Sequence, residues 1–208
     1  MKVFLSWSGI KSHNVALAFK NWLPIVIHEI SEEDIFMSSE NIDKGSRWNA
    51  EIANKLENSN FGIICVTAEN TQAPWLQFES GALSKKETSR VCSFLFDLNE
   101  IDSKNPLFQF QSTKYEKNDI LKLVKSLRDV FSPKLTDTTL QGTFEGCYAK
   151  LKKELDKINK EGKTTKAPYE ELKKVKSKIE EELKDMTLSE VKAELEPYYK
   201  AIRGILEN

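Results

Sequence analysis

The chain has 208 residues, of which 39% are hydrophobic and 30% charged, and its formal net charge is −1. This length allows one sizeable domain with a small appendage, and the balanced charge argues against a broad basic surface for nucleic acid. No stretch approaches the roughly 20 apolar residues of a membrane helix, and the N-terminus MKVFLSW lacks a signal-peptide layout. We therefore expect a cytoplasmic protein that binds neither nucleic acid nor membrane.

Short apolar runs alternate with helical patterns along the first sixty residues. Val3–Leu5 reads as a buried strand that ends in the turn Ser6–Gly9. A helix follows, with Ser12 as its expected N-cap, and Ile35–Met37 is a second short strand. The polar loop Ser38–Ser46 then leads to a helix that is expected to carry four residues on one face: Trp48, Ile52, Ala53 and Leu56.

The same alternation continues to residue 131. Phe61–Thr67 (FGIICVT) is apolar on both faces, as in a parallel sheet covered by helices. Pro74 opens a helix at a favoured first-turn position. Val91–Phe96 predicts a fourth strand and Phe108–Gln111 a weaker fifth, followed by a helix over residues 120–131.

Strands separated by helices of this length predict an α/β domain with a mostly parallel, doubly wound sheet of about five strands. Ligands on such sheets bind beyond the carboxyl ends of the strands. Three irregular loops therefore converge at one edge of the predicted sheet: Ser6–Gly9, Ser38–Ser46 and Thr67–Trp75.

The last third of the chain is charged and helical in pattern. A helix over residues 139–160 has an apolar stripe, which we expect to pack on the core of residues 1–131 and complete a domain of residues 1–160. Residues 161–168 (EGKTTKAP) favour a linker. Residues 169–208 predict a helical hairpin extension, with Thr187 and Glu190 as a capping box for its second helix.

Cysteine and histidine give no metal-binding pattern. Cys65, Cys92 and Cys147 form no CxxC pair, and the two histidines have no zinc-ligand spacing. Cys65 and Cys92 each lie in an apolar run, which favours a buried, reduced thiol. We expect no metal ligand in this chain.

The helix that begins at Pro74 carries the most informative pattern. Trp75 and Glu79 are four residues apart, so they share one face near the helix N-terminus. The helix dipole helps to keep a carboxylate ionised there. Taken alone, the pattern fits either a surface glutamate beside a core tryptophan or a carboxylate that does chemistry.

A second pattern lies in the loop after Ile35–Met37. Gly45 suits a tight turn, and Ser46 is a candidate cap for the next helix. Arg47 and Trp48 then offer a phosphate-binding cation and a stacking ring at a helix start. An ordinary surface loop is the alternative interpretation.

Together, these segments resemble the Toll/interleukin-1 receptor (TIR) domain family over roughly residues 2–131. The family's first box resembles Phe4–Ser8, its BB loop resembles Met37–Trp48 with Asp43 and Gly45, and its Trp-x-x-x-Glu motif is matched by Trp75 and Glu79. The resemblance implies a flavodoxin-like fold. The Trp-rich loops look more like bacterial TIR proteins implicated in antiviral defence than like receptor-type members.

The resemblance further implies an NAD⁺ glycohydrolase or cyclase that splits the nicotinamide–ribose bond and releases ADP-ribose or a cyclic ADP-ribose signal. Glu79 is then the catalytic carboxylate, and NAD⁺ is the substrate, with no cofactor. One carboxylate suffices chemically, because nicotinamide leaves as a neutral base and needs no general acid. Eight further residues are expected to line the substrate site: Ser6, Trp7, Ser8, Ser38, Gly45, Arg47, Trp48 and Trp75.

Two other functions stay open. A non-enzymatic TIR scaffold would act through TIR–TIR contacts that use the Ser38–Ser46 loop. The third hypothesis is a nucleotide-sensing or flavodoxin-like binding protein. The chain has no GxGxxG, P-loop, HExxH or GxSxG motif. The resemblance also implies self-association in the active form. The apolar stripe from Leu172 to Met186 either drives assembly, binds a partner protein or folds back on its own domain.

Overall fold

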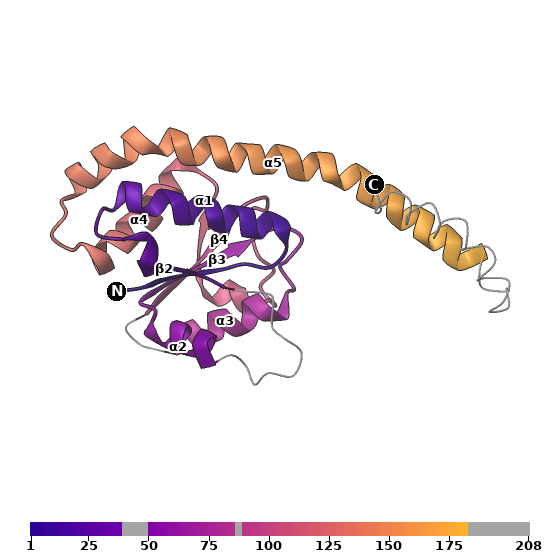
Figure 1. Ribbon diagram of the computed structural model, residues 1–208, viewed down its shortest axis with the longest axis horizontal. Coiled ribbons are helices and arrows are strands. Elements are labelled where there is room, and N and C mark those ends of the chain that lie inside the picture. Colours follow the sequence, from indigo (N-terminus) through magenta and orange to yellow (C-terminus); the bar gives the residue numbers. More distant parts are fainter. Residues whose placement is uncertain (39–49, 86–88, 183–208) are drawn as a thin grey trace, which may run out of the picture. The chain divides into compact units, whose positions relative to one another are not determined.

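The computed structural model describes residues 1–38, 50–85 and 89–182 (Figure 1). The chain divides into two compact units, residues 1–160 and 161–208. In chain order, the elements are β1 (Val3–Ser6), α1 (Ile10–Val26), η1 (Glu32–Asp34), β2 (Ile35–Met37), α2 (Ala50–Asn58), β3 (Phe61–Val66), α3 (Pro74–Ser84), β4 (Arg90–Leu95), η2 (Pro106–Gln109), β5 (Gln111–Lys114), α4 (Lys117–Phe131) and α5 (Asp137–Glu182).

The five strands form one parallel sheet in the order β2-β1-β3-β4-β5. This order confirms the flavodoxin-like α/β fold expected for the chain. The chain leaves β1 toward β2 on one side and later returns to β3 on the other. The carboxyl ends of β1 and β3 therefore flank the topological switch point, where ligands of such folds bind.

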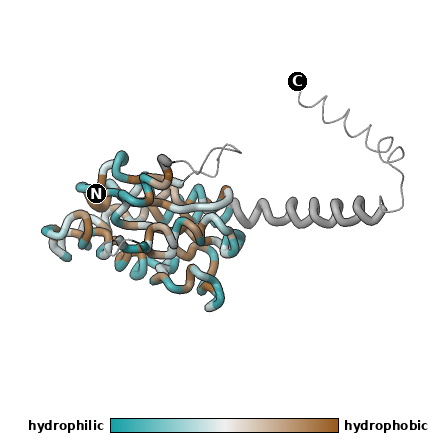
Figure 2. Tube along the Cα trace, turned by 90° about the horizontal axis from the view of Figure 1, so that it is seen from below, coloured by the Kyte–Doolittle hydropathy of each residue, from teal (hydrophilic) through white to brown (hydrophobic). Residues whose placement is uncertain are grey.

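Alternation along the strands creates two hydrophobic cores, one on each face of the sheet. Val3 and Leu5 of β1 belong to the core under α1, α4 and the first part of α5. Phe4 belongs to the opposite core, which α2 and α3 cover. Figure 1 shows α1 and α4 on one side of the sheet and α2 and α3 on the other, and Figure 2 shows apolar and polar segments alternating through residues 1–160.

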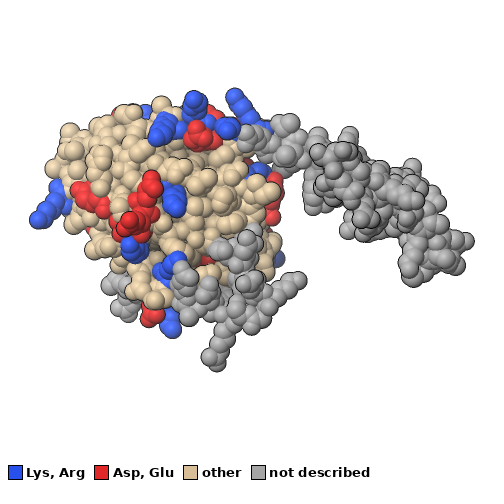
Figure 3. All heavy atoms as spheres, viewed as in Figure 1, with Lys and Arg blue, Asp and Glu red and all other residues tan. Residues whose placement is uncertain are grey.

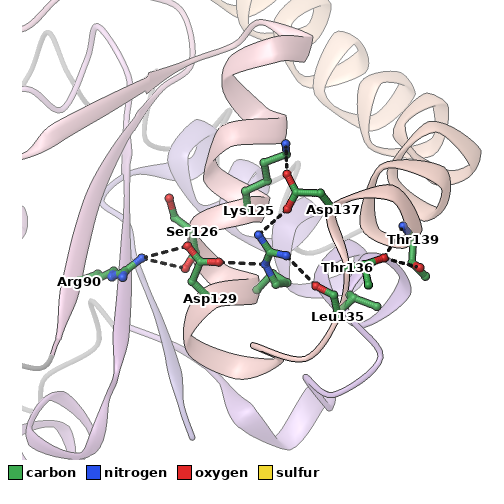
Figure 4. Close-up of polar contacts among 9 residues, drawn as sticks. Arg90, Lys125, Ser126, Asp129, Leu135, Thr136, Asp137 and Thr139 are labelled. Atoms are coloured by element: carbon green, nitrogen blue, oxygen red, sulfur yellow. Dashed lines mark hydrogen bonds and ion pairs between the residues drawn. The ribbon is translucent and has the colours of Figure 1, made fainter.

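The start of α5 is tied to the end of α4 by ion pairs and hydrogen bonds (Figure 4). The Arg128 guanidinium donates to the Leu135 carbonyl at 2.6 Å and to the Asp137 carboxylate at 2.7 Å. Lys125 reaches the other oxygen of Asp137 at 2.8 Å. These contacts set the turn between the helices, from which Leu140 and Phe144 enter the core.

Three local expectations were wrong. The fifth strand is Gln111–Lys114, not Phe108–Gln111, because Pro106 starts a 3₁₀ turn in which Asn105 accepts a hydrogen bond from the Leu107 amide at 2.9 Å. Ser12 is not the cap of α1, since the helix begins at Ile10 and the Ser12 hydroxyl donates to the Cys65 carbonyl at 2.6 Å. Ala53 is exposed, whereas Ile52 and Leu56 are buried, because only the latter two face the sheet.

Helix α5 also runs through residues 161–168, where the sequence favoured a linker. The lysine and glutamate residues on both sides of this segment are good helix formers, which outweighs one glycine and one proline in so long a helix. The helix expected after Thr187, and the loop residues 39–49, lie outside the described residues.

Two surface properties bear on partners. None of the helices in the described part of the chain is long and apolar enough to cross a membrane. The face shown in Figure 3 carries small groups of acidic and basic side chains side by side. This agrees with the near-zero net charge of the whole chain.

Candidate functional site

Glu79 lies in the middle of α3, on the side of the helix that faces the sheet. The buried residues of α3 are Leu76, Glu79, Ser80 and Leu83, which follow the three- and four-residue steps of a helix face packed on a core. Glu79 is 0% exposed. A glutamate in such a stripe is uncommon, because a buried carboxylate loses its hydration and needs hydrogen-bond partners in return.

The Ser6 hydroxyl donates a hydrogen bond to the Glu79 carboxylate at Oε2. Ser6 is the last residue of β1, and it points to the same face as Phe4, toward α3. The Cα–Cβ bonds of a helix tilt toward its N-terminus, and the N-terminus of α3 lies at the carboxyl edge of the sheet. The carboxylate is therefore held at the edge where ligands of this fold bind.

Trp7 and Ser38 adjoin this pair at the ends of β1 and β2. The Trp7 amide donates to the Ser38 hydroxyl oxygen at 3.2 Å, and the Ser38 amide donates to the Leu5 carbonyl at 2.9 Å. The Trp7 ring packs edge-on against His13, with 4.4 Å between the ring centroids. Its indole Nε1 is buried and has no hydrogen-bond partner among the described residues.

A pocket of about 360 Å³ opens at the switch point between β1 and β3. Its walls come from the β1–α1 turn with the start of α1, and from the β3–α3 loop: Ser8, Gly9, Lys11, Ser12, Thr67, Glu69, Asn70, Gln72 and Ala73. Gly9 has φ +83°, a left-handed conformation that turns the chain from β1 into α1. Ser8 follows Ser6 by two residues, and Ala73 caps the helix that carries Glu79, so the same two segments form the pocket and hold the carboxylate.

Asn70 fixes the two loops of the pocket to each other. Its side-chain nitrogen donates to the Ser8 carbonyl at 3.0 Å and to the Cys65 carbonyl at 3.1 Å. Its side-chain oxygen accepts from the Thr67 amide at 2.7 Å. Asn70 is buried, so each of these hydrogen bonds replaces water that the backbone groups have lost.

Lys11 lines the pocket and forms ion pairs with two carboxylates, one of which follows β4. The Lys11 ammonium lies 2.5 Å from Glu69 Oε1 and 3.0 Å from Asp97 Oδ2. Burial by itself lowers the pKa of Lys11, but the hydrogen bonds to Glu69 and Asp97 outweigh burial and raise it. Asp97 also accepts from the Ala68 amide at 2.7 Å. The loops after β3 and β4 and the start of α1 are thus joined through one cation.

The structure brings together some of the expected site residues. Ser6 contacts Glu79, Ser38 contacts Trp7, and Ser8 lines the pocket. Trp75 is half-buried, and its ring stacks on Phe78 with 6.5 Å between the centroids. Three further expected residues lie outside the described part of the chain: Gly45, Arg47 and Trp48.

The sequence interpretation missed Lys11, Asn70 and Asp97. Asn70 and Asp97 each follow the end of a strand, β3 and β4, by a few residues. The rule that ligand-binding residues follow the carboxyl ends of parallel strands could have identified both. Lys11 carries no comparable signal, because a lysine in the first turn of a helix is usually solvated.

The three cysteines are buried and free. Burial raises the pKa of the Cys92 thiol to about 11, which argues against its use as a nucleophile. Within the described residues, no three His, Cys, Asp or Glu side chains are grouped so that they could hold a metal ion.

No model of a known protein family matches this chain, and no curated protein matches its sequence.

Proposed function

We propose that this chain is a TIR-type NAD⁺ glycohydrolase or cyclase in which Glu79 is the catalytic carboxylate. The observation that carries the proposal is the buried Glu79 carboxylate, held by Ser6 at the carboxyl edge of the sheet. Structural glutamates are seldom buried in an apolar stripe, whereas a carboxylate that stabilises a developing cation gains from a site without water.

The chemistry needs only one carboxylate. The bond between ribose C1′ and the nicotinamide nitrogen breaks, and both electrons leave with nicotinamide, which becomes neutral. Glu79 stabilises the oxocarbenium-like sugar electrostatically. Attack by water at C1′ gives ADP-ribose and releases one proton. Attack by a nitrogen of the adenine base gives cyclic ADP-ribose instead.

The pocket between β1 and β3 supports the proposal, because about 360 Å³ of polar space adjoins the segments that hold Glu79. The Ser8 hydroxyl and the Gln72 amide in its lining suit the ribose and diphosphate parts of a dinucleotide. The Trp7 indole adds a donor that has no partner among the described residues and can meet a substrate oxygen. Trp75 and Trp48 remain proposed stacking rings for the substrate, and Arg47 remains a proposed phosphate contact.

Full burial of Glu79 sets a condition on turnover. In this conformation solvent does not reach the carboxylate, so substrate binding must rearrange the side chains around it. Self-association is one means of driving such a change and is part of the proposal, as are a cytoplasmic location and a role in bacterial immunity. All three come from the resemblance to TIR proteins.

The test is to incubate concentrated protein with NAD⁺ and to follow nicotinamide and ADP-ribose by NMR. Glu79→Gln keeps the shape and can still accept from Ser6, but it removes the charge; we expect cleavage to fall by roughly a thousandfold. Glu154→Gln, at an exposed position of α5, is the matched control and should cleave like the wild type. Retained turnover in folded Glu79→Gln would show that Glu79 is not the catalytic carboxylate.

The scaffold function is decided by the same assay. If neither the wild type nor Glu79→Gln releases nicotinamide, even when a fused oligomerisation domain forces assembly, the chain is no NAD⁺ glycohydrolase. The TIR–TIR scaffold would then be the better account.

A further inference from the structure

We infer that Ser6 is a positioning residue, whose hydroxyl orients the Glu79 carboxylate and keeps it ionised, and not a substrate-binding residue. This inference rests on the proposed function for its catalytic consequence, although the contact itself does not. It changes the role that the sequence favoured for Ser6, which was to line the substrate site.

The Ser6 hydroxyl can donate only one hydrogen bond. A serine has one O–H, and in Ser6 it is directed to Glu79 Oε2. The same proton is then not available to a substrate oxygen. Ser6 is 0% exposed, as Glu79 is, so its hydroxyl faces the carboxylate and not the solvent in this conformation.

The residues packed around Glu79 affect the charge of its carboxyl group. Glu79 shares its buried stripe with Leu76 and Leu83, and the sheet beneath contributes Phe4 and Ile64 to the same core. Apolar surroundings favour the protonated form of a carboxyl group, whereas a hydrogen bond donated to the carboxylate favours the charged form. The Ser6 hydroxyl supplies such a bond from the sheet.

A second serine lies in the same row of the sheet. Ser6 is in register with Ile64 of β3, and Ile64 is in register with Ser93 of β4. Ser93 is also 0% exposed, but its hydroxyl has no hydrogen-bond partner among the described residues. Of these two hydroxyls, only that of Ser6 bonds to Glu79, so Ser93→Ala is a matched control for Ser6→Ala.

The experiment combines a titration without substrate and a kinetic measurement. The carboxyl carbon of Glu79 is followed by ¹³C NMR against pH in the wild type, Ser6→Ala, Ser6→Thr and Ser93→Ala, after assignment of its signal with Glu79→Gln. Values of kcat and KM for NAD⁺ are measured on the same proteins. Their thermal unfolding confirms that each variant is folded.

We expect the Glu79 carboxyl to titrate at a higher pH in Ser6→Ala than in the wild type, while Ser93→Ala matches the wild type. In Ser6→Ala, kcat should fall by roughly 10- to 100-fold with KM within about twofold, and the acid limb of the pH profile should move up with the titration. Ser6→Thr, which keeps the hydroxyl, should restore both. If its extra methyl prevents folding, Ser6→Ala against Ser93→Ala decides the matter.

Two results would overturn the inference. An unchanged titration in folded Ser6→Ala would mean that the hydroxyl does not act on the carboxylate. A raised KM with unchanged kcat would make Ser6 a substrate contact. If the wild type does not cleave NAD⁺, the proposed function fails, but the titration still decides whether Ser6 holds Glu79.

Discussion

The two edges of the sheet each carry a pocket, and they differ in how their polar groups are held. At the carboxyl edge, the pocket of about 360 Å³ is formed by groups that several loops contribute and that bond to one another, as Asn70 and Lys11 do. Near the start of β4 and along β5, beside α4, a larger pocket of about 530 Å³ is lined by Arg90, Asp119 and Lys122, among others.

The two cations of the larger pocket are exposed to solvent. Lys122 pairs with Asp119 one turn earlier on α4, at 2.9 Å, and its side chain is 77% exposed. Arg90 is exposed and lies 3.8 Å from Asp129 (Figure 4). Exposed ion pairs of this kind contribute little to stability and give little selectivity for a ligand. Pocket volume alone would favour the amino edge, whereas buried polar groups joined across several elements favour the carboxyl edge, where we propose that the substrate binds.

The largest effect on the scaffold of the carboxyl edge is expected from Asn70→Ala. This change leaves the buried Thr67 amide and the Ser8 carbonyl without their side-chain partner, which should lower the free energy of unfolding by about 2–3 kcal/mol. NAD⁺ cleavage should fall with it, because the β1–α1 turn loses its anchor. Denaturant unfolding and the cleavage assay check both. Unchanged stability would mean that the two loops are held by other contacts.

A smaller effect is expected from Lys11→Met, about 1 kcal/mol, since its partner Glu69 is exposed. The pKa of Lys11 is raised in the folded state, so the ion pairs stabilise the protein at every pH below the usual value of 10.5. This contribution is lost as the pH rises through the raised value. The difference in Tm between Lys11→Met and the wild type should therefore be constant from pH 6 to 9 and shrink above about pH 10.5. A constant difference at all pH values would count against the ion pairs.

The smallest effect is expected at the amino edge. Arg90→Ala and Lys122→Ala should change NAD⁺ cleavage by less than about twofold, because both remove exposed cations whose ion pairs are screened by solvent. Steady-state kinetics of the two variants provide the check. A tenfold loss in either would place function at the larger pocket and reverse the comparison of the edges.

The sequence predicted the sheet well where strands are apolar on both faces. Phe61–Val66 is buried at every position, so its pattern identifies a central strand without tertiary information. Gln111–Lys114 could not be predicted in this way, because only Thr113 of β5 is buried. Pairing with β4 sets this strand, through Cys92 opposite Gln111.

The sequence named two side chains that the structure brings into contact, but it did not predict the contact. Glu79 and Ser6 were both identified, yet they are 73 positions apart, and local patterns contain nothing about which side chain meets which. The burial of Glu79 could have been expected, because Leu76, Ser80 and Leu83 mark the same helix face. The ion pair between Lys11 and Asp97 depends on the order of the strands in the sheet. It could not be predicted from the sequence alone.

The most direct test of the central claim is the rate of nicotinamide release by the wild type and by Glu79→Gln at equal, high protein concentration. The account predicts release by the wild type and a loss of roughly a thousandfold in the variant, with an unchanged melting temperature. Release by a folded Glu79→Gln within tenfold of the wild type would contradict it, since the buried carboxylate would then have no part in the reaction.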